Sequence, residues 1–329
     1  MMRLPKFAYL APKTIGEAVR MMGEAGPSGQ FVAGGTDLYP NMKRRQQTPR
    51  TVISVGRVPE LQRIEGDGGE GLRIGAGVSL TEIVESPVVN RDYPSVARAA
   101  RLISTPTLRN MGTVGGNLLL DTRCNYYDQN FEWRKGINFC LKKDGDVCWV
   151  APGSAKCWAV QSSDLVPLMV AIGARLRLVS TVGDRLVDAR GFYNDDGIDY
   201  LRKRPDELLA EIHLPPSAGW RAVYKKLRRR GAFDFPVLGV AARLDEEEDG
   251  TVREARVVLG GISPAPLEVE AASRALAGGP LDDERISAAA EACYLRARPL
   301  DNTDHLMNYR KQMARPFVLR ALRELSAER

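Results

Sequence analysis

Thr113-Val-Gly-Gly-Asn117 leads directly into the stretch that distinguishes this chain, a segment with four cysteines. They are Cys124, Cys140, Cys148 and Cys157, spaced C-x15-C-x7-C-x8-C, and Cys293 is the only other cysteine in the sequence. The residues between them are polar and aromatic without a sustained helical or strand period, so the pattern predicts no packed core there. We therefore expect the four thiolates to converge on one metal centre, with Cys293 outside it.

Two metal centres accept four thiolates without histidine, namely structural zinc and an iron–sulfur cluster. Zinc sites usually take their sulfurs in short C-x2-4-C pairs, and no such pair occurs here. Widely spaced single cysteines favour the larger [4Fe-4S] cluster. Structural zinc, two disulfides and four unrelated buried thiols remain open alternatives. We see no signal peptide, which argues against disulfides and predicts a cytoplasmic protein.

The composition is that of an ordinary soluble protein, with 44% hydrophobic and 27% charged residues. No apolar run reaches the roughly 18 residues of a membrane span. A length of 329 residues predicts two or three domains. The net charge of +6 is small, and the basic run Lys225–Arg230 lacks the interleaved aromatic residues of a nucleic-acid platform. We therefore expect neither a membrane span nor bound nucleic acid.

The first 55 residues predict a small α/β unit with a parallel sheet, because strands and helices alternate. Thr14-Ile-Gly-Glu17 has the pattern of a capping box that opens the first helix. A second unit begins near Leu72. The predicted strands are 7–9, 31–33, 51–55, 72–75 and 174–179, and the predicted helices are 14–22, 37–45, 79–85, 95–103 and 164–173.

Beyond about residue 205 the pattern changes to strands followed by helices, which predicts a separate α+β module. Pro215–Gly219 is the expected boundary. The predicted strands are 207–214, 222–227, 237–244 and 252–259, and the helices are 267–277, 283–297 and 305–325. Gly66-x-Gly68-x-x-Gly71 matches the dinucleotide fingerprint in letters, but a strand follows where a helix is required, so we expect a hairpin.

Two glycine pairs carry a hypothesis of phosphate binding. Val32-Ala-Gly-Gly-Thr-Asp37 lies between a predicted strand and a predicted helix, and Thr113–Asn117 lies between two structured segments. Glycine lets backbone N–H groups approach a phosphate, and the start of a helix adds a favourable dipole. A tight turn is the ordinary alternative for each pair.

Four motifs together resemble the FAD-binding medium subunit of the xanthine dehydrogenase and carbon monoxide dehydrogenase family, over essentially the whole chain. They are Ala33–Asp37, Leu72–Ala76, Arg109–Asn117 and Ser163–Leu165. The segment that begins Thr122-Arg-Cys124-Asn-Tyr-Tyr127 is similar to that of the beta subunit of 4-hydroxybenzoyl-CoA reductase, where it carries an extra [4Fe-4S] cluster. A related group of bacterial aldehyde oxidoreductases also has a cluster in its flavin subunit, with differently spaced cysteines.

The resemblance implies an α+β chain with the vanillyl-alcohol-oxidase-like (PCMH-type) FAD-binding fold. Two α/β subdomains are expected at 1–55 and 56–204, with the cluster insert at about 122–160, and a C-terminal flavoprotein domain at 215–329. Because relatives without the insert join its flanks directly, we expect the fold not to depend on it.

The resemblance also implies a set of binding residues. Asp164 would bond near the flavin ring or ribityl chain, with a helix N-cap as its alternative role, and Lys225 is the alternative to Lys226. The implied FAD-binding residues are Ala33, Gly34, Gly35, Thr36, Asp37, Leu38, Thr113, Gly116, Asn117, Asp164 and Lys226, and the implied cluster ligands are Cys124, Cys140, Cys148 and Cys157.

The expected function is electron transfer. The chain has two histidines, His213 and His305, and shows no paired carboxylates or nucleophile–base set, so we predict no catalytic residue in it. The resemblance implies a large partner subunit with a molybdenum–molybdopterin cofactor and a small one with two [2Fe-2S] clusters, assembled as a dimer of heterotrimers.

Two directions of electron flow stay open. In a 4-hydroxybenzoyl-CoA reductase, electrons from a low-potential donor such as ferredoxin pass through [4Fe-4S] and FAD to molybdenum. In an aldehyde, xanthine or N-heterocycle dehydrogenase they flow outward to an acceptor. An isolated flavin-dependent oxidase is disfavoured, because it needs a substrate pocket and a base of its own.

Overall fold

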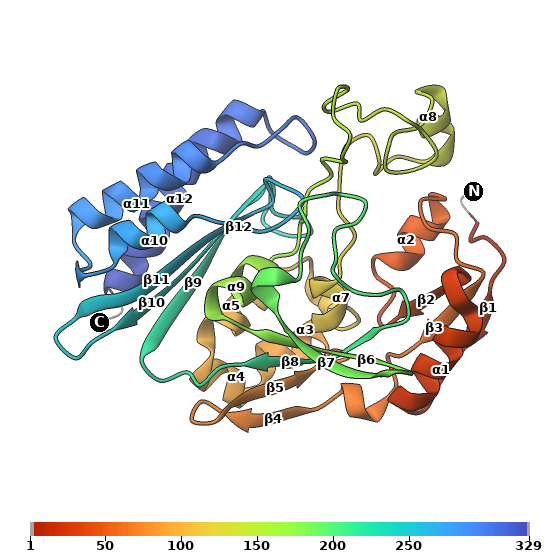
Figure 1. Ribbon diagram of the computed structural model, residues 1–329, viewed down its shortest axis with the longest axis horizontal. Helices are drawn as coiled ribbons and strands as arrows, with labels where there is room; N and C mark the ends of the chain where they lie inside the picture. The colour runs from red at the N-terminus through yellow and green to blue at the C-terminus, as the bar shows by residue number, and fades with distance from the viewer. Residues whose placement is uncertain (1–2, 328–329) are drawn as a thin grey trace.

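The structure, a computed structural model, describes residues 3–327 and contains three β-sheets with helices packed around them (Figure 1). The strands are β1 (Ala8–Leu10), β2 (Gly29–Val32), β3 (Thr51–Ser54), β4 (Ile64–Asp67), β5 (Gly71–Gly75), β6 (Arg175–Ser180), β7 (Gly183–Asp188), β8 (Leu208–Leu214), β9 (Trp220–Leu227), β10 (Leu238–Glu246), β11 (Thr251–Gly260), β12 (Leu267–Glu268) and β13 (Gly279–Pro280). The α-helices are α1 (Ile15–Ala25), α2 (Leu38–Lys43), α3 (Leu80–Glu85), α4 (Pro87–Asp92), α5 (Pro94–Arg101), α6 (Pro106–Arg109), α7 (Val114–Leu118), α8 (Phe131–Gly136), α9 (Leu165–Ile172), α10 (Glu270–Leu276), α11 (Asp283–Arg296) and α12 (Met307–Ala327).

The N-terminal unit is the predicted parallel sheet, with strand order β1-β3-β2. Thr14 caps the start of helix α1, because its hydroxyl accepts a hydrogen bond from the Glu17 amide at 3.1 Å. The reciprocal half of the expected capping box is absent, because the Glu17 carboxylate accepts from the amide of Lys13 instead. Val19, Met22 and Ile53 are buried between the helix and the sheet.

The middle unit is an antiparallel sheet of order β4-β5-β8-β6-β7. The glycine-rich segment Gly66–Gly71 lies in the predicted β4–β5 hairpin, with positive φ at both glycines. One expectation was wrong: β8, which we assigned to the C-terminal module, pairs with β5 and β6 at the centre of this sheet. A strand's period identifies its type but not its partners, since pairing depends on long-range contacts.

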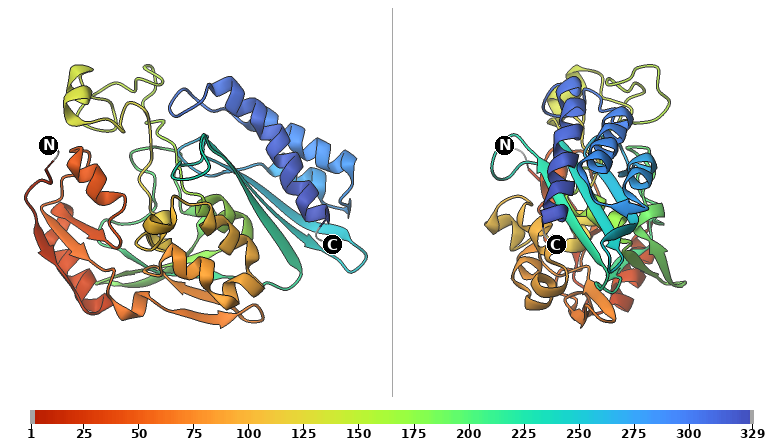
Figure 2. Two further views of the ribbon diagram at one scale, coloured as in Figure 1. Left: turned by 180° about the vertical axis from the view of Figure 1, so that it is seen from behind. Right: turned by 90° about the vertical axis from the view of Figure 1, so that its left-hand side faces the viewer.

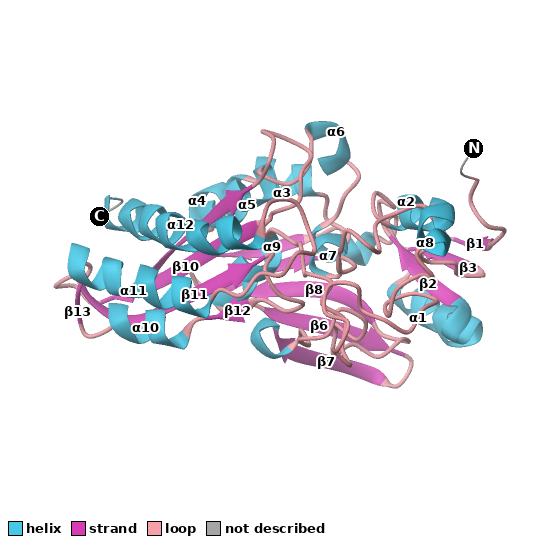
Figure 3. Cartoon of the chain, turned by 90° about the horizontal axis from the view of Figure 1, so that it is seen from above, coloured by secondary structure: helices cyan, strands magenta, loops and turns pink. Residues whose placement is uncertain are grey.

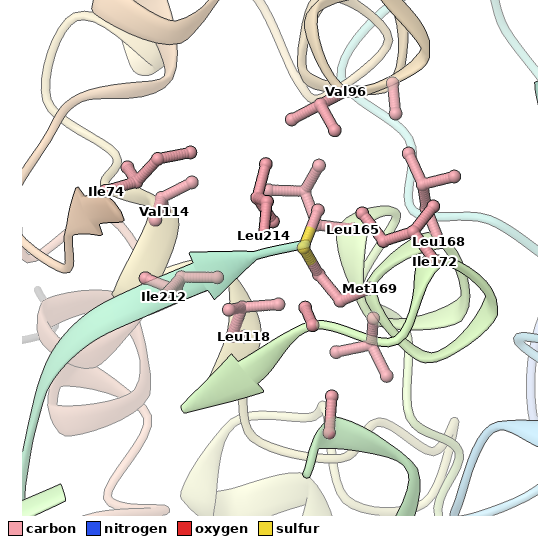
Figure 4. Close-up of a cluster of buried hydrophobic side chains, with 14 of the residues drawn as sticks. Ile74, Val96, Val114, Leu118, Leu165, Leu168, Met169, Ile172, Ile212 and Leu214 are labelled. Atoms are coloured by element: carbon pink, nitrogen blue, oxygen red, sulfur yellow. The ribbon is translucent and has the colours of Figure 1, made fainter. Parts of the chain in front are cut away.

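The largest core lies between this middle sheet and its helices. The helix α9 is buried along its whole length and contributes Leu165, Leu168 and Met169 (Figure 4). Side chains from β5, α5, α7 and β8 surround it, and they include Ile74, Val96, Val114, Leu118, Ile212 and Leu214.

The C-terminal unit is an antiparallel sheet of order β12-β11-β10-β9, with α10, α11 and α12 along one side of it (Figures 1 and 3). The predicted α+β character is confirmed. The expected helix at 267–277 begins only at Glu270, because Leu267 and Glu268 pair with β11 as strand β12. Within residues 3–327 no helix is long and apolar enough to cross a membrane.

Residues 122–160, here called the cysteine lobe, extend away from the sheets as loops with one short helix, α8 (Figures 1 and 2). Arg134 is fully buried and donates hydrogen bonds at 3.0 Å to the carbonyl oxygens of Arg44 and Arg45, just after α2. On the other side, the Asn302 side chain donates to the carbonyl oxygen of Trp158 at 2.7 Å. The lobe is therefore tied to both the N-terminal and the C-terminal units.

Candidate functional site

A cavity of about 630 Å³ lies where the N-terminal and middle units meet. The loops after β2 and before α7 line it, together with residues from the start of α9 and from segments 198–209 and 233–235. Ten residues expected to bind FAD line this cavity: Ala33, Gly34, Gly35, Thr36, Asp37, Leu38, Thr113, Gly116, Asn117 and Asp164. Their role as FAD ligands stays a prediction.

The first glycine pair, Gly34 and Gly35, is shaped for close approach. Gly35 has a φ of +70°, and a Cβ added there would overlap the ring of Tyr39. A Cβ on Gly34 would overlap the carbonyl oxygen of Met111. Among the backbone hydrogen bonds of residues 3–327, none is donated by the amides of residues 34–38. A row of such unpaired amides beside a cavity is suited to bind a phosphate group.

The second pair, Gly115 and Gly116, has a different role. The amide of Gly115 donates to the carbonyl oxygen of Ala76 at 2.9 Å, and that of Gly116 donates to the Thr113 hydroxyl at 3.1 Å. A Cβ on Gly115 would lie 2.6 Å from the Cβ of Ala76. These glycines allow α7 to pack closely against the middle sheet, and their amides are not free for a phosphate.

Asp164 is an interior carboxylate with two partners. Its Oδ1 accepts from the Tyr224 hydroxyl at 2.9 Å, and its Oδ2 pairs with the Lys226 ammonium at 2.9 Å. Burial raises the pKa of Asp164, and the adjacent Lys226 opposes that rise. The expected alternative role as N-cap is not observed, because the hydroxyl of Ser163 accepts from the Leu165 amide instead.

Lys226 does not line the cavity; it reaches it only through Asp164. Its side chain is 1% exposed, whereas Lys225 points to the other side of β9 and pairs with Glu324 at the surface. The alternation of the strand therefore selects Lys226 as the inward residue.

Asp37 is a cavity carboxyl with an unusual pKa. Burial raises the pKa of Asp37 to about 6, although the Arg123 guanidinium, 3.7 Å from its Oδ1, lowers it. The neighbouring Asp121 and Asp128 raise it further, and a hydrogen bond from Asn41 lowers it. This carboxyl can therefore change its charge near neutral pH at the wall of the cavity.

Cys124, Cys140, Cys148 and Cys157 line a second, smaller cavity inside the cysteine lobe. All four are buried free thiols, so the structure has no disulfide within residues 3–327. Burial raises the pKa of Cys124 to about 12 and that of Cys157 to about 11. Cys293 is buried in α11 and belongs to the C-terminal core, as expected.

Groups around the second cavity suit a negatively charged occupant. The amide of Ala159 donates to the sulfur of Cys157 at 3.4 Å. Burial raises the pKa of Cys124 and of Cys140, and hydrogen bonds from backbone amides oppose that rise. At Cys140, where burial raises the pKa, the charge of buried Arg134 also opposes the rise. The Nε and Nη1 atoms of Arg134 have no hydrogen-bond partner. Amide-to-sulfur bonds and nearby cations are the usual surroundings of a cluster held by thiolates.

Within residues 3–327, no three histidine, cysteine or acidic side chains are arranged to hold a metal ion. A single zinc needs four ligand atoms within about 2.0–2.3 Å of one point. The expected [4Fe-4S] cluster therefore stays a prediction.

Sequence reasoning missed Lys142, Asp121 and the buried Arg134, which lie between or beside the two cavities. The charged residue Lys142 two positions after a predicted ligand, Cys140, was the available signal. A single such cation is common on a protein surface, so the signal was weak.

Two family models together match nearly the whole chain. The model described as the FAD binding domain in molybdopterin dehydrogenase matches residues 5–217. The model described as the CO dehydrogenase flavoprotein C-terminal domain matches residues 222–325.

Characterised relatives agree with these matches. The chain is 30% identical to the carbon monoxide dehydrogenase medium chain of Hydrogenophaga pseudoflava, over 97% of this chain and 96% of that one. It is 33% identical to the aldehyde oxidoreductase FAD-binding subunit PaoB of Escherichia coli K12, over 83% and 86%. A solved structure of carbon monoxide dehydrogenase from H. pseudoflava, which lacks the Mo-pyranopterin moiety of the molybdenum cofactor, superposes with a TM-score of 0.81 over 98% of each chain, at 30% identity.

Proposed function

Because this chain belongs to the family of FAD-binding medium subunits of molybdopterin dehydrogenases, we propose that it is an electron-transfer subunit that carries both FAD and a [4Fe-4S] cluster. The observation that carries the second cofactor is the single cavity lined by four buried, unbridged cysteines. The free amides of residues 34–38 support the binding of FAD.

The residues of the chain have distinct tasks in this proposal. The amides after β2 would bind the FAD diphosphate, and Asn117 and Asp164, which line the same cavity, would orient the flavin. Cys124, Cys140, Cys148 and Cys157 hold the cluster. FAD supplies the exchange between one-electron and two-electron carriers when it is bound.

The partner subunits follow from the family. A large subunit with the molybdenum cofactor performs the substrate chemistry, and a small subunit with two [2Fe-2S] clusters connects it to this chain, as a dimer of heterotrimers. Five carboxylates that line the cavity are each paired with a lysine or an arginine, which supports electron transfer rather than acid–base catalysis as the role of this chain. They are Asp37, Asp121, Asp164, Glu207 and Asp234.

We propose 4-hydroxybenzoyl-CoA as the substrate of the assembled enzyme, reduced to benzoyl-CoA with loss of the phenolic hydroxyl as water. The cysteine pattern that begins at Cys124 supports this substrate. Electrons would then arrive from a low-potential protein such as ferredoxin. Oxidation of an aldehyde is the second candidate, supported by 33% identity to an aldehyde oxidoreductase subunit.

Metal analysis of the anaerobically purified chain tests the cluster. We expect about four irons and four labile sulfides per chain, lost in Cys148→Ser and retained in Cys293→Ser. Zinc in place of iron, or no metal in the wild-type chain, would contradict it.

Co-purification with the partner subunits tests the function. We expect a complex that contains molybdenum and reduces 4-hydroxybenzoyl-CoA with reduced ferredoxin. Oxidation of aldehydes without this reduction would select the second candidate, and a chain that oxidises a substrate alone would reject both.

A further inference from the structure

The cavity of about 630 Å³, here called the flavin cavity, and the smaller cavity lined by the four cysteines, here called the cysteine cavity, share a wall. The side chain of Lys142 crosses this wall. Lys142 lines the cysteine cavity, and its ammonium pairs at 2.8 Å with Asp121, which lines the flavin cavity. The Lys142 side chain is 7% exposed and the Asp121 side chain 10%. The pair is therefore largely removed from water, although its two members belong to different sites.

The ammonium of Lys142 uses all its donors in this wall. Besides Asp121, it donates to the Thr122 hydroxyl and to the Gly197 carbonyl oxygen, both at 2.6 Å. An ammonium group has three protons, so these three acceptors fix it completely. The ring centroids of Tyr127 and Tyr200 lie 4.8 and 5.2 Å from the same nitrogen.

The partners of Lys142 continue into both cavities. Asp121 also accepts from the Tyr127 hydroxyl and the Gln47 amide, both at 2.9 Å, and Gln47 lines the flavin cavity. Gly197 donates its amide to the carbonyl oxygen of Cys157 at 2.9 Å, and a Cβ on Gly197 would lie 2.8 Å from the Cys157 sulfur.

The segment 197–200 thus touches Cys157 at one end. Its remaining residues, Ile198, Asp199 and Tyr200, line the flavin cavity. Lys142 binds Gly197, at the start of this segment, to Asp121 and Thr122.

We propose that Lys142 is a positioning residue that couples the two cavities. By holding Asp121, Thr122 and Gly197 together, it makes occupancy of the flavin cavity reduce the exposure of Cys140 and Cys157. Coupling of this kind is reciprocal, so the state of the cysteine cavity changes the affinity for FAD by the same factor. The proposal rests on FAD binding in the larger cavity, but not on the identity of the metal.

The experiment measures alkylation of individual cysteines in the metal-free, full-length chain, with and without saturating FAD. In the wild type we expect FAD to slow the labelling of Cys140 and Cys157 by about fivefold or more. In Lys142→Met the ratio of the labelling rate without FAD to the rate with FAD should lie within about twofold of one, and FAD should bind more weakly. Lys143→Met is the matched control, because the Lys143 side chain is 32% exposed and pairs only with Asp144; it should keep the wild-type ratio.

Labelling of Cys293 separates coupling from unfolding, since this thiol is buried in the C-terminal core away from both cavities. If Lys142→Met exposes Cys293, Asp121→Asn replaces it as the test and should abolish the ratio in the same way. A wild-type chain without protection by FAD, or a folded Lys142→Met that keeps the full protection, would overturn the proposal. Iron content does not enter this measurement, so its failure is distinguishable from failure of the cluster assignment. Direct titration of FAD binding distinguishes a chain that has lost the coupling from a chain that does not bind flavin.

Discussion

At the scale of single residues, residues of the same type have different roles around the flavin cavity. Lys226 is buried against Asp164, and Lys225 is half-exposed against Glu324. Gly35 has a left-handed conformation beside free amides, whereas Gly116 donates its amide to Thr113. We therefore expect substitution of Lys226 to have a different effect from substitution of Lys225, and substitution of Gly35 a different effect from substitution of Gly116.

Replacement of Lys226 by methionine should leave Asp164 buried without its cation. Loss of one partner of a buried ion pair costs about 3–5 kcal/mol, so Lys226→Met should lower the free energy of unfolding by about that amount. Lys225→Met, which removes a half-exposed pair, should cost less than about 1 kcal/mol. Urea titration of the two variants measures the difference, and equal losses would contradict the assigned role of Lys226.

Gly35→Val should abolish retention of FAD. A β-branched residue disfavours a φ of +70°, and its side chain would overlap the ring of Tyr39 beside the amides after β2. Gly219→Ala is the control, because Gly219 has a φ of +80° with open space around it, away from the cavity. Flavin content per folded chain is the measurement, and full occupancy in Gly35→Val would disprove the phosphate site.

The affinity for FAD should fall as the pH rises above about 6. Burial raises the pKa of Asp37 to about 6, against the opposing charge of Arg123. A bound diphosphate favours the neutral carboxyl, so it raises this pKa further, and binding takes up a proton between the two values. Asp37→Asn should bind FAD with little dependence on pH in this range. A wild-type affinity that rises with pH would contradict the role of Asp37.

At the scale of elements, the cysteine lobe is an insertion that the rest of the fold holds at two sides. Buried Arg134 binds the carbonyl oxygens that follow α2, and Lys142 balances Asp121 in the wall of the flavin cavity. These contacts bear against the expectation that the fold is indifferent to the insert. Its removal leaves a buried carboxylate without a cation.

Replacement of residues 125–158 by a short linker should therefore weaken FAD binding and lower stability, while the three sheets still form. Adding Asp121→Asn to the deletion should recover part of both losses, since it removes the unpaired charge. Reduction of 4-hydroxybenzoyl-CoA by a protein donor should be lost in either form of the assembled complex. Turnover at the wild-type rate would show that electrons do not enter through the lobe. A complex that fails to assemble would instead make the lobe structural.

At the scale of the whole molecule, three units meet around the cavities. Their cores are shared in part, because Tyr224 and Ala241 of the C-terminal sheet pack in the core of the middle unit. The parallel N-terminal sheet supplies the free amides, the middle unit supplies Asn117 and Asp164, and the C-terminal strand β9 supplies Lys226 and Tyr224. No single unit contains the complete site.

The sequence by itself determined the local features of this protein. Periodicity predicted the parallel N-terminal unit and the α+β C-terminal unit, and glycine next to a strand predicted the turn at Gly34 and Gly35. Both depend on neighbouring residues, because backbone conformation and burial period are local properties. The four cysteines were also visible as a set by their number and their isolation.

Only the tertiary structure decided which distant residues meet. The structure pairs β8 with β5 and brings Lys142 to Asp121, and in each case the two partners are separated in the sequence. It also turns Lys226, and not its neighbour Lys225, toward Asp164. Such contacts depend on how sheets and loops pack together, and a one-residue shift in a strand reverses the face that a side chain takes. For that reason the Lys142–Asp121 contact between the two cavities became visible only in the folded chain.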